Sequence, residues 1–163
     1  MAAAKGFFSI IQFCPDLDRG ESANVGVVLV VPRDRFLGVR MSDDNEGPKQ
    51  RFGQDAFDDA RLSIAKKAME GRLRHEGGTW TAPEDLLRFG MKEGNSLILT
   101  QPRVILVEDA VAETEELFRR LVHVEARHAK RQPKPDLKVL FEPKVIGVPL
   151  RRNLRVEIPE MGT

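Results

Sequence analysis

The sequence predicts an α+β fold in which an antiparallel sheet, beginning with a three-strand meander, carries helices packed on one face. Three observations lead to this class. The first 41 residues hold three aromatic or β-branched runs separated by turn-forming residues. Residues 56–74 and 111–130 place apolar side chains at helical spacing. A hydrophobic fraction of 41% in 163 residues is enough to bury the core of one compact domain.

The meander is predicted from three consecutive segments. Residues 7–14 form a run rich in Phe and Ile that Pro15 ends. Residues 24–31 form an uncharged, Val-rich run, which is typical of a central strand covered on both faces. Residues 31–35, Val-Pro-Arg-Asp-Arg, have the composition of a tight turn, and residues 36–41 follow as the third strand.

The middle of the chain is predicted to hold a loop and two helices. Residues 42–52 are acidic and contain Gly and Pro, so we expect a loop there. The first helix covers residues 56–74, with Asp55 as its N-cap. Its apolar positions are Phe57, Ala60, Ile64, Ala65, Ala68 and Met69. The second helix covers residues 83–91, with Thr81 as its cap.

Residues 96–100 and 103–107 are predicted strands, interrupted by Pro102, which indicates a bend or a sheet edge. The clearest helix follows over residues 111–130, capped by Asp109. Its apolar arc consists of Leu117, Phe118, Leu121, Val122, Val124, Ala126 and Ala129. We expect residues 1–135 to form a single core domain and residues 136–163 a strand-like C-terminal extension.

The opposite arc of this last helix is basic and is a candidate recognition face. Its members are Arg119, Arg120, His123, Arg127, Lys130 and Arg131. Such a face could bind phosphates or an acidic protein, although a solvated helix surface has the same composition. The acidic residues Asp43, Asp44, Glu46, Asp55, Asp58 and Asp59 would give the molecule a dipolar charge distribution.

The composition excludes several classes of protein. The net charge of +1 predicts no chain-wide attraction to nucleic acid or to membranes. Cys14 is the only cysteine, so neither an intramolecular disulfide nor a cysteine-rich zinc site can form. No stretch matches a secretory signal or a membrane span, and we expect a cytoplasmic protein without membrane contact.

The loop after the first predicted strand carries a dense group of polar residues. Asp16, Asp18 and Glu21 could hold a divalent cation through their carboxylate oxygens. The alternative is structural: Asp16 and Asn24 cap backbone groups, Gly20 supplies a positive φ, and Arg19 pairs with Glu21. We expect the structural alternative and no metal. Asn24 and Gly26 are predicted to determine the fold, with Gly26 allowing close approach of a neighbouring segment.

The signature Phe8-Ser-Ile-Ile-Gln-Phe-Cys-Pro-Asp16, Arg19-Gly-Glu21 and Asn24-Val-Gly-Val-Val-Leu29 resembles the opening of a bacterial family, the domain-of-unknown-function family numbered 3037. The stretch 97–102 and the helix with Leu117 and Phe118 resemble it too, so the resemblance extends over residues 7–122. Gln12-Phe13 departs from its usual aromatic and basic pair. The resemblance implies no known reaction and no catalytic residue, but it implies a gene neighbourhood shared with a HipA-like kinase.

Other catalytic patterns are poor fits. Asp136 and Glu142-Pro-Lys144 mimic a nuclease site, but they are too close in sequence for two paired strands. Glu125 and His128 supply only one of the two pairs that a di-iron bundle needs. A buried structural role is expected for Cys14.

The function expected from the sequence is therefore that of a non-catalytic accessory protein without a cofactor. It would bind another protein, and a HipA-like kinase is the first candidate through the resemblance. The alternative is a nucleic-acid-binding or metal-dependent phosphate-processing protein. That protein would use the basic recognition face together with Asp16 and Glu21.

Overall fold

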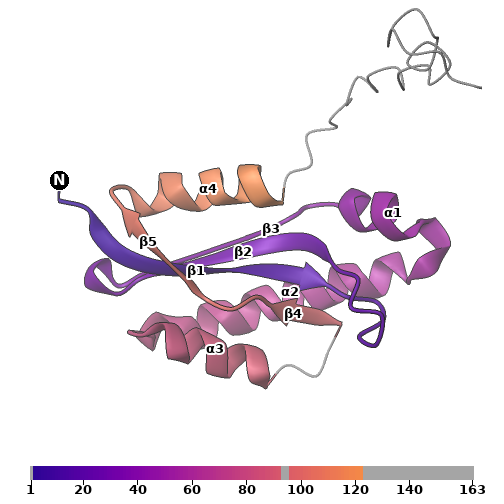
Figure 1. Cartoon of the computed structure of the whole chain (residues 1–163), viewed down its shortest axis with the longest axis horizontal. Helices are drawn as coiled ribbons and strands as arrows, with labels where there is room; N and C mark the ends of the chain where they lie inside the picture. The colour runs from indigo at the N-terminus through magenta and orange to yellow at the C-terminus, as the bar shows by residue number, and fades with distance from the viewer. Residues whose placement is uncertain (1, 93–95, 123–163) are drawn as a thin grey trace, which may run out of the picture. The chain divides into compact units, whose positions relative to one another are not determined.

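A computed structural model describes residues 2–92 and 96–122 (Figure 1). The elements in chain order are β1 (Ala4–Phe13), β2 (Ala23–Val31), β3 (Phe36–Met41), α1 (Glu46–Phe52), α2 (Asp59–Glu76), α3 (Pro83–Met91), β4 (Leu97–Leu99), β5 (Arg103–Val107) and α4 (Ala110–Leu121). The α+β class is confirmed. The predicted boundary between a core domain and an extension, at residues 135 and 136, lies outside the described residues.

The described strands form one antiparallel sheet in the order β3-β2-β1-β4, and β5 also pairs with β1. The three-strand meander is confirmed, with Val28 opposite both Ser9 of β1 and Val39 of β3. The register shifts by one residue between Ile11 and Gln12, where β2 carries a bulge with Val25 as its extra residue. The break at Pro102 is confirmed as well, because β4 and β5 pair with successive stretches of β1 on either side of it.

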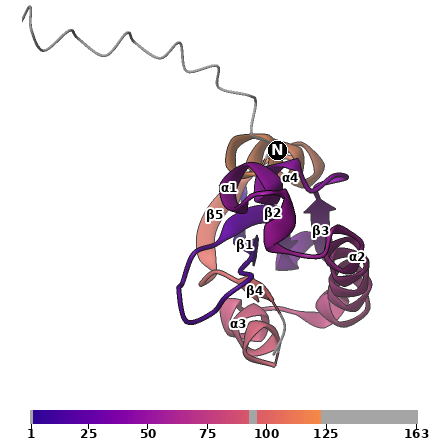
Figure 2. The same cartoon turned by 90° about the vertical axis from the view of Figure 1, so that its right-hand side faces the viewer.

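The prediction that the helices share one face of the sheet is wrong. Helices α2 and α3 pack on one face and α4 packs on the other (Figures 1 and 2). The reason lies in β1, where Phe7 and Ile11 join the core under α2 and α3, while Phe8 and Ile10 join the core under α4. Because both faces of the strand are apolar, each face needs its own helical cover.

Strand β2 has the central position that its uncharged run predicted. Its fully buried side chains are split between the two cores: Val25 and Val28 join the core under α2 and α3, whereas Val27, Leu29 and Val31 join the core under α4. The turn after it is also confirmed: Pro32–Asp34 form one turn of 3-10 helix, and Arg35 then takes a left-handed conformation with φ +47°.

The predicted loop over residues 42–52 is wrong in its second half, which folds as helix α1. Tertiary contacts override the loop-like composition there. Phe52 packs edge-on against Phe13 of β1, with ring centroids 6.1 Å apart. Before the helix, the buried Asn45 donates to the backbone oxygen of Asp59 (3.1 Å) and to Ser63 Oγ (3.0 Å).

Helix α2 begins three residues later than predicted. Its N-cap is Asp58, whose side chain accepts the Arg61 N–H at 3.0 Å, so the assignment to Asp55 is wrong. The predicted apolar face is also wrong at Ile64, which is 68% exposed. The buried face consists of Leu62, Lys66, Met69 and Leu73. A lysine in the buried stripe concealed this face from a pattern based on apolar residues alone.

Helix α3 has the predicted bounds, but its cap differs. Ala82 is the N-cap, and Asp85 accepts the N–H groups of Thr81 (3.0 Å) and Ala82 (3.1 Å), so Thr81 is not the cap. The cap of α4 is confirmed, because Asp109 accepts from the N–H groups of both Val111 and Ala112.

The rest of the predicted final helix, residues 123–130, lies outside the described residues. Within the part of the chain that the structure describes, no helix combines the length and the apolar character needed to cross a membrane.

Candidate functional site

The signature loop after β1 is held by its own backbone. Asp16 Oδ1 accepts the N–H groups of Asp18 (3.0 Å) and Arg19 (3.4 Å), and Gly20 has φ +66°. These are the structural roles predicted for Asp16 and Gly20. No ion pair joins Arg19 to Glu21 among the described residues. Residues 2–92 and 96–122 also contain no group of three His, Cys, Asp or Glu residues placed to hold a metal ion.

Asn24 and Gly26, at the start of β2, connect the signature to the rest of the fold. Asn24 Nδ2 donates to the Leu121 carbonyl oxygen at 2.8 Å, and its Oδ1 accepts from Gln12 Nε2 at 2.8 Å. The expected bonds to loop backbone are therefore replaced by a bond to the C-terminal end of α4. The close approach predicted at Gly26 is confirmed, because a Cβ there would lie 2.9 Å from the Arg40 carbonyl oxygen.

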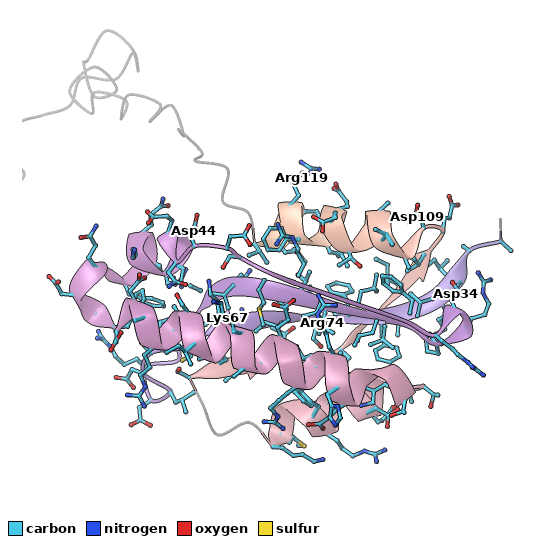
Figure 3. The ribbon with its side chains drawn as sticks, turned by 180° about the vertical axis from the view of Figure 1, so that it is seen from behind. Asp34, Asp44, Lys67, Arg74, Asp109 and Arg119 are labelled. Atoms are coloured by element: carbon cyan, nitrogen blue, oxygen red, sulfur yellow. The ribbon has the colours of Figure 1, made fainter. Side chains whose placement is uncertain are left out.

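Cys14 has the structural role that was predicted. It is buried, and its Sγ donates to the Asp16 carbonyl oxygen at 3.2 Å. Of the basic recognition face, only Arg119 and Arg120 are described. Arg119 makes a bidentate contact with Glu116 (2.8 and 3.0 Å) and points away from the sheet in Figure 3. His123, Arg127, Lys130 and Arg131 lie outside the described residues, as do Glu125, His128, Asp136 and Glu142.

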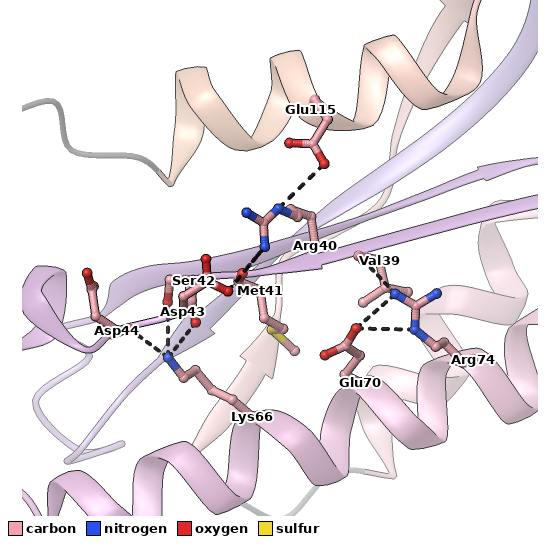
Figure 4. Close-up of polar contacts among 10 residues, drawn as sticks. All are labelled: Val39, Arg40, Met41, Ser42, Asp43, Asp44, Lys66, Glu70, Arg74 and Glu115. Atoms are coloured by element: carbon pink, nitrogen blue, oxygen red, sulfur yellow. Dashed lines mark hydrogen bonds and ion pairs between the residues drawn. The ribbon is translucent and has the colours of Figure 1, made fainter.

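A second cationic region, absent from the sequence-based predictions, lies beside the outer edge of β3. It is a cleft of about 290 Å³ between β3 and α2, which we call the β3 cleft (Figures 3 and 4). Four cationic and two anionic side chains line it, namely Arg40, Lys66, Lys67, Arg74, Asp43 and Glu70. The remaining lining residues are Val39, Met41, Ser42 and Ser63.

Lys66 anchors the end of β3 to helix α2. Its Nζ donates to the carbonyl oxygens of Asp44 (2.7 Å) and Ser42 (2.8 Å) and to Ser42 Oγ (3.2 Å) (Figure 4). The residue is only 4% exposed, and loss of water around the ammonium group lowers the pKa of Lys66. Three acceptors satisfy all three N–H donors, so this lysine has a structural role.

Arg40 lies between β3 and α4. Its guanidinium carbon is 4.7 Å from the centroid of the Phe118 ring, and its Nε lies 3.5 Å from a Glu115 carboxylate oxygen. Its Nη1 donates to the Met41 carbonyl oxygen (3.1 Å) and to Asp43 Oδ1 (3.4 Å). The hydrogen bond to Asp43 raises the pKa of Arg40 further above its usual range. The side chain is therefore fixed in both position and charge.

Arg74 contacts the same strand from helix α2. Its Nη2 donates to the Val39 carbonyl oxygen at 3.2 Å and to Glu70 Oε1 at 2.8 Å. This contact defines which backbone groups of β3 face outward. The Val39 carbonyl faces α2, whereas Ser42 N–H bonds inward to Val25 of β2. Because backbone direction alternates along an edge strand, Leu37, Val39 and Met41 direct their N–H and C=O groups away from the sheet.

The outer edge of β3 is thus partly covered. Arginine side chains occupy the outward carbonyls of Val39 and Met41. Among the described residues, no acceptor is assigned to the outward N–H groups of Leu37, Val39 and Met41. The edge lies between α2 and α4 (Figure 3). In chemical terms it is a row of backbone donors flanked by positive charge, which suits an extended chain with carbonyl acceptors and acidic side chains.

One sequence signal could have located the β3 cleft. Leu62, Lys66, Met69 and Leu73 follow the spacing of a buried helical stripe, and Lys66 is its only charged member. A charged residue in such a stripe requires polar partners from the facing element. The identity of those partners, backbone carbonyls of the segment after β3, depends on the tertiary fold.

Comparison with known proteins gives one match. A family model described as "Protein of unknown function (DUF3037)" matches residues 8–122, more than half of the chain. No curated protein and no solved structure matches.

Proposed function

Because the chain belongs to the DUF3037 family, whose model spans residues 8–122, we propose a function that resides in this part of the chain. The protein is a non-catalytic binding module that receives an extended segment of a partner protein along the outer edge of β3. The observation that carries the proposal is that the backbone N–H groups of Leu37, Val39 and Met41 point away from the sheet, at an edge that lies between α2 and α4.

The side chains around the edge favour binding over catalysis. Lys66, Arg40 and Arg74 are each held by carbonyl or carboxylate oxygens of the protein itself. A catalytic base or nucleophile needs a group that is free to exchange a proton or an electron pair with a substrate. The polar groups of the β3 cleft instead fix the edge in place. Strand addition then derives its affinity from main-chain hydrogen bonds.

The charges of the cleft support one class of partner segment. The lining has four cations and two carboxylates. Lys67 has no polar partner among the described residues, so it is available to an incoming carboxylate. An extended segment with acidic side chains therefore fits better than a basic one. The family resemblance makes a HipA-like kinase the first partner to examine.

The test is backbone hydrogen exchange in the full chain, with and without the HipA-like kinase of the same organism. On binding, the amides of Leu37, Val39 and Met41 should become protected. Those of Gly38 and Arg40 already bond to β2 and should change little. Binding that leaves all three outward amides unprotected would place the interface elsewhere.

Charge variants provide the matched control. Lys67→Glu should weaken the complex severalfold, because it places a negative charge beside the acidic segment. Lys92→Glu makes the same charge change at the exposed end of α3, away from the cleft, and should leave affinity unchanged. Equal effects of the two variants would indicate a long-range charge effect and not contact at the cleft.

Nucleic-acid binding is the second candidate. The observation that favours it is the exposure of Arg119 and Arg120 on the outward face of α4. If this role is correct, Arg120→Glu combined with Arg127→Glu should abolish duplex binding while far-UV circular dichroism stays native. The affinity of the unmodified protein should also fall steeply with salt, with a slope of about −0.9 for each neutralised phosphate. Binding that does not depend on salt would exclude this role.

A further inference from the structure

Strand β5 forms the opposite border of the sheet, on the side of β1 away from β2 (Figure 1). It reads Arg-Val-Ile-Leu-Val. Val104 is 57% exposed and Leu106 is 71% exposed, although both belong to a regular strand. Among the described elements, β5 pairs only with β1. Proteins usually protect such a border with charge, proline or a bulge, and this strand has none of these beyond the arginine that begins it.

The hydrogen bonds of β1 show which backbone groups of β5 face outward. The Ile10 carbonyl accepts from Thr100 N–H at 3.0 Å, so even-numbered residues in this part of β1 direct their backbone toward β4 and β5. Gly6 is opposite Ile105, and these two residues bond to each other. Val104 and Leu106 therefore direct their N–H and C=O groups outward. No partner is assigned to these four groups among the residues that the structure describes.

We propose that β5 pairs with β5 of a second copy of this chain. The two strands run antiparallel about a two-fold axis perpendicular to the sheet, with Ile105 opposite Ile105 of the second copy. Val104 then lies opposite Leu106 of the second copy, and Leu106 lies opposite Val104 of the second copy. Each of these pairs exchanges two backbone hydrogen bonds, which uses all the outward groups of both strands.

The register follows from the sequence around the strand. A one-residue slip would place the exposed apolar side chains of the two copies on opposite faces of the joined sheet. A two-residue slip in one direction places Leu106 opposite Pro102, which has no N–H to donate. A two-residue slip in the other direction places Val104 opposite Glu108. The arrangement centred on Ile105 alone pairs both exposed apolar side chains with each other.

Charge complementarity identifies the occupant as a second copy in the antiparallel sense. Arg103 begins the strand, and Glu108 directly follows it. Leu106 and Glu108 also line a hollow of about 490 Å³ with Asp109, Glu113 and Glu116. An antiparallel copy brings its Arg103 beside Val107 and within reach of this acidic group, twice per dimer. A parallel copy would place like charges together.

This dimer is independent of the proposed function, because it uses the opposite border of the sheet. The two β3 edges remain free at the far ends of the joined sheet. The first measurement is the mass of the full chain in solution by light scattering. It should be twice 18.3 kDa and should decrease on dilution.

Variants of exposed residues test the surface without disturbing the core. Leu106→Lys places a charge on the proposed interface and should give a monomer with native circular dichroism. Ile64→Lys is the matched control, because Ile64 is equally exposed on α2 and lies outside the interface. If both variants dissociate the dimer, or neither does, the β5 interface is wrong.

Charge exchange and cross-linking test the orientation and the register. Arg103→Glu should weaken the dimer at least tenfold, and adding Glu108→Arg should restore it. A mixture of Val104→Cys and Leu106→Cys chains should form a disulfide heterodimer, because directly opposite Cα atoms lie about 5.5 Å apart. Neither variant should cross-link with itself.

A full chain that stays monomeric at every concentration would overturn the proposal. If the amides of Val104 and Leu106 were protected from exchange in that monomer, another segment of the same chain would be covering the strand. Cross-linking of either cysteine variant with itself would overturn the register centred on Ile105.

Discussion

Gly26 has no side chain, and this allows strands β2 and β3 to pack closely against each other. A Cβ there would lie 2.5 Å from Met41 Sδ and 2.9 Å from the Arg40 carbonyl oxygen. The sulfur can move, but the carbonyl belongs to the paired strand β3. Gly26→Ala should therefore lower the free energy of unfolding by about 1–3 kcal/mol, as overpacking does in other cores.

Gly71 is the matched control for this prediction. It lies inside α2, where an added Cβ would meet nothing within 4 Å. Gly71→Ala should raise stability by about 0.5–1 kcal/mol, because alanine has the higher helix propensity. Urea unfolding of the two variants measures both effects. An unchanged midpoint for Gly26→Ala would show that β3 can move away from β2.

Lys66 predicts a specific pH dependence of stability. Burial lowers its pKa below the 10.5 of an unfolded chain. Between the lowered pKa and 10.5, the unfolded chain binds more protons than the folded one, so the free energy of unfolding rises with pH. Below this pH range, Lys66 is charged in both states, and the folded state carries the full free-energy cost of burying that charge.

The comparison with Lys66→Met isolates this effect. The variant should start about 1–3 kcal/mol less stable, because the Ser42 and Asp44 carbonyls lose their donor. Its deficit should widen as the pH rises toward 10.5, since only the unmodified protein gains stability there. The chain has no tyrosine that would titrate in this range. Urea unfolding at a series of pH values measures both free energies of unfolding. If the difference between the unmodified protein and Lys66→Met stayed constant with pH, the prediction would be contradicted.

At the scale of elements, Asn24 connects strand β2 to the end of α4. Its side chain donates to the Leu121 carbonyl oxygen at 2.8 Å, which satisfies one of the free acceptors of that helix end. Asn24→Asp keeps an acceptor for Gln12 but loses this donor, and it adds a negative charge at the negative end of the helix dipole. Hydrogen exchange should become faster in the last turn of α4 and stay unchanged in α3.

The outcome for the elements shows where sequence patterns suffice. The bounds of β3 and α3 agree with the prediction, because a turn or a proline marks their ends in the local sequence. Helix α1 was not predicted, because its seven residues have loop-like composition and depend on packing against β1 and β2. The α2 face was misassigned because Lys66 occupies a buried position whose polar partners come from a distant loop.

The candidate site was predicted to a smaller extent. Asp16, Gly20 and Gly26 were assigned correctly, because backbone caps, positive φ and close approach are local requirements of a turn and a strand. The partner of Asn24 and the whole β3 cleft were missed. Both bring together groups that are far apart in sequence, such as Lys66 with Asp44. A pattern in a single sequence does not show that such groups are in contact in the fold.

At the scale of the whole molecule, two cores share the same strands. Leu117 of α4 is fully buried on one face, and Trp80, the only tryptophan, packs against Phe89 on the other. Leu117→Ala should cost about 2–5 kcal/mol. Since β1 and β2 contribute side chains to both cores, the whole sheet should be destabilised. The urea unfolding midpoint measured by Trp80 fluorescence should therefore fall by the same amount as the midpoint measured by far-UV circular dichroism.

The control for this prediction is Val111→Ala on the same helix, where the side chain is 64% exposed and the change should be close to neutral. If the Trp80 transition were unchanged in Leu117→Ala, the two faces would unfold separately, and the molecule would not be a single cooperative unit.

The pairing of β1 with β5 sets an order of events during synthesis. Ala4 lies opposite Val107, so the first of the described strands to leave the ribosome meets the last of them. The meander can form early from neighbouring sequence, but the described partners of the other side of β1 are β4 and β5, which emerge only with residues 97–107. Contacts so distant along the chain slow the completion of folding. A nascent chain stalled before residue 103 should therefore engage holding chaperones through β1, and release of residues 103–107 should end that engagement.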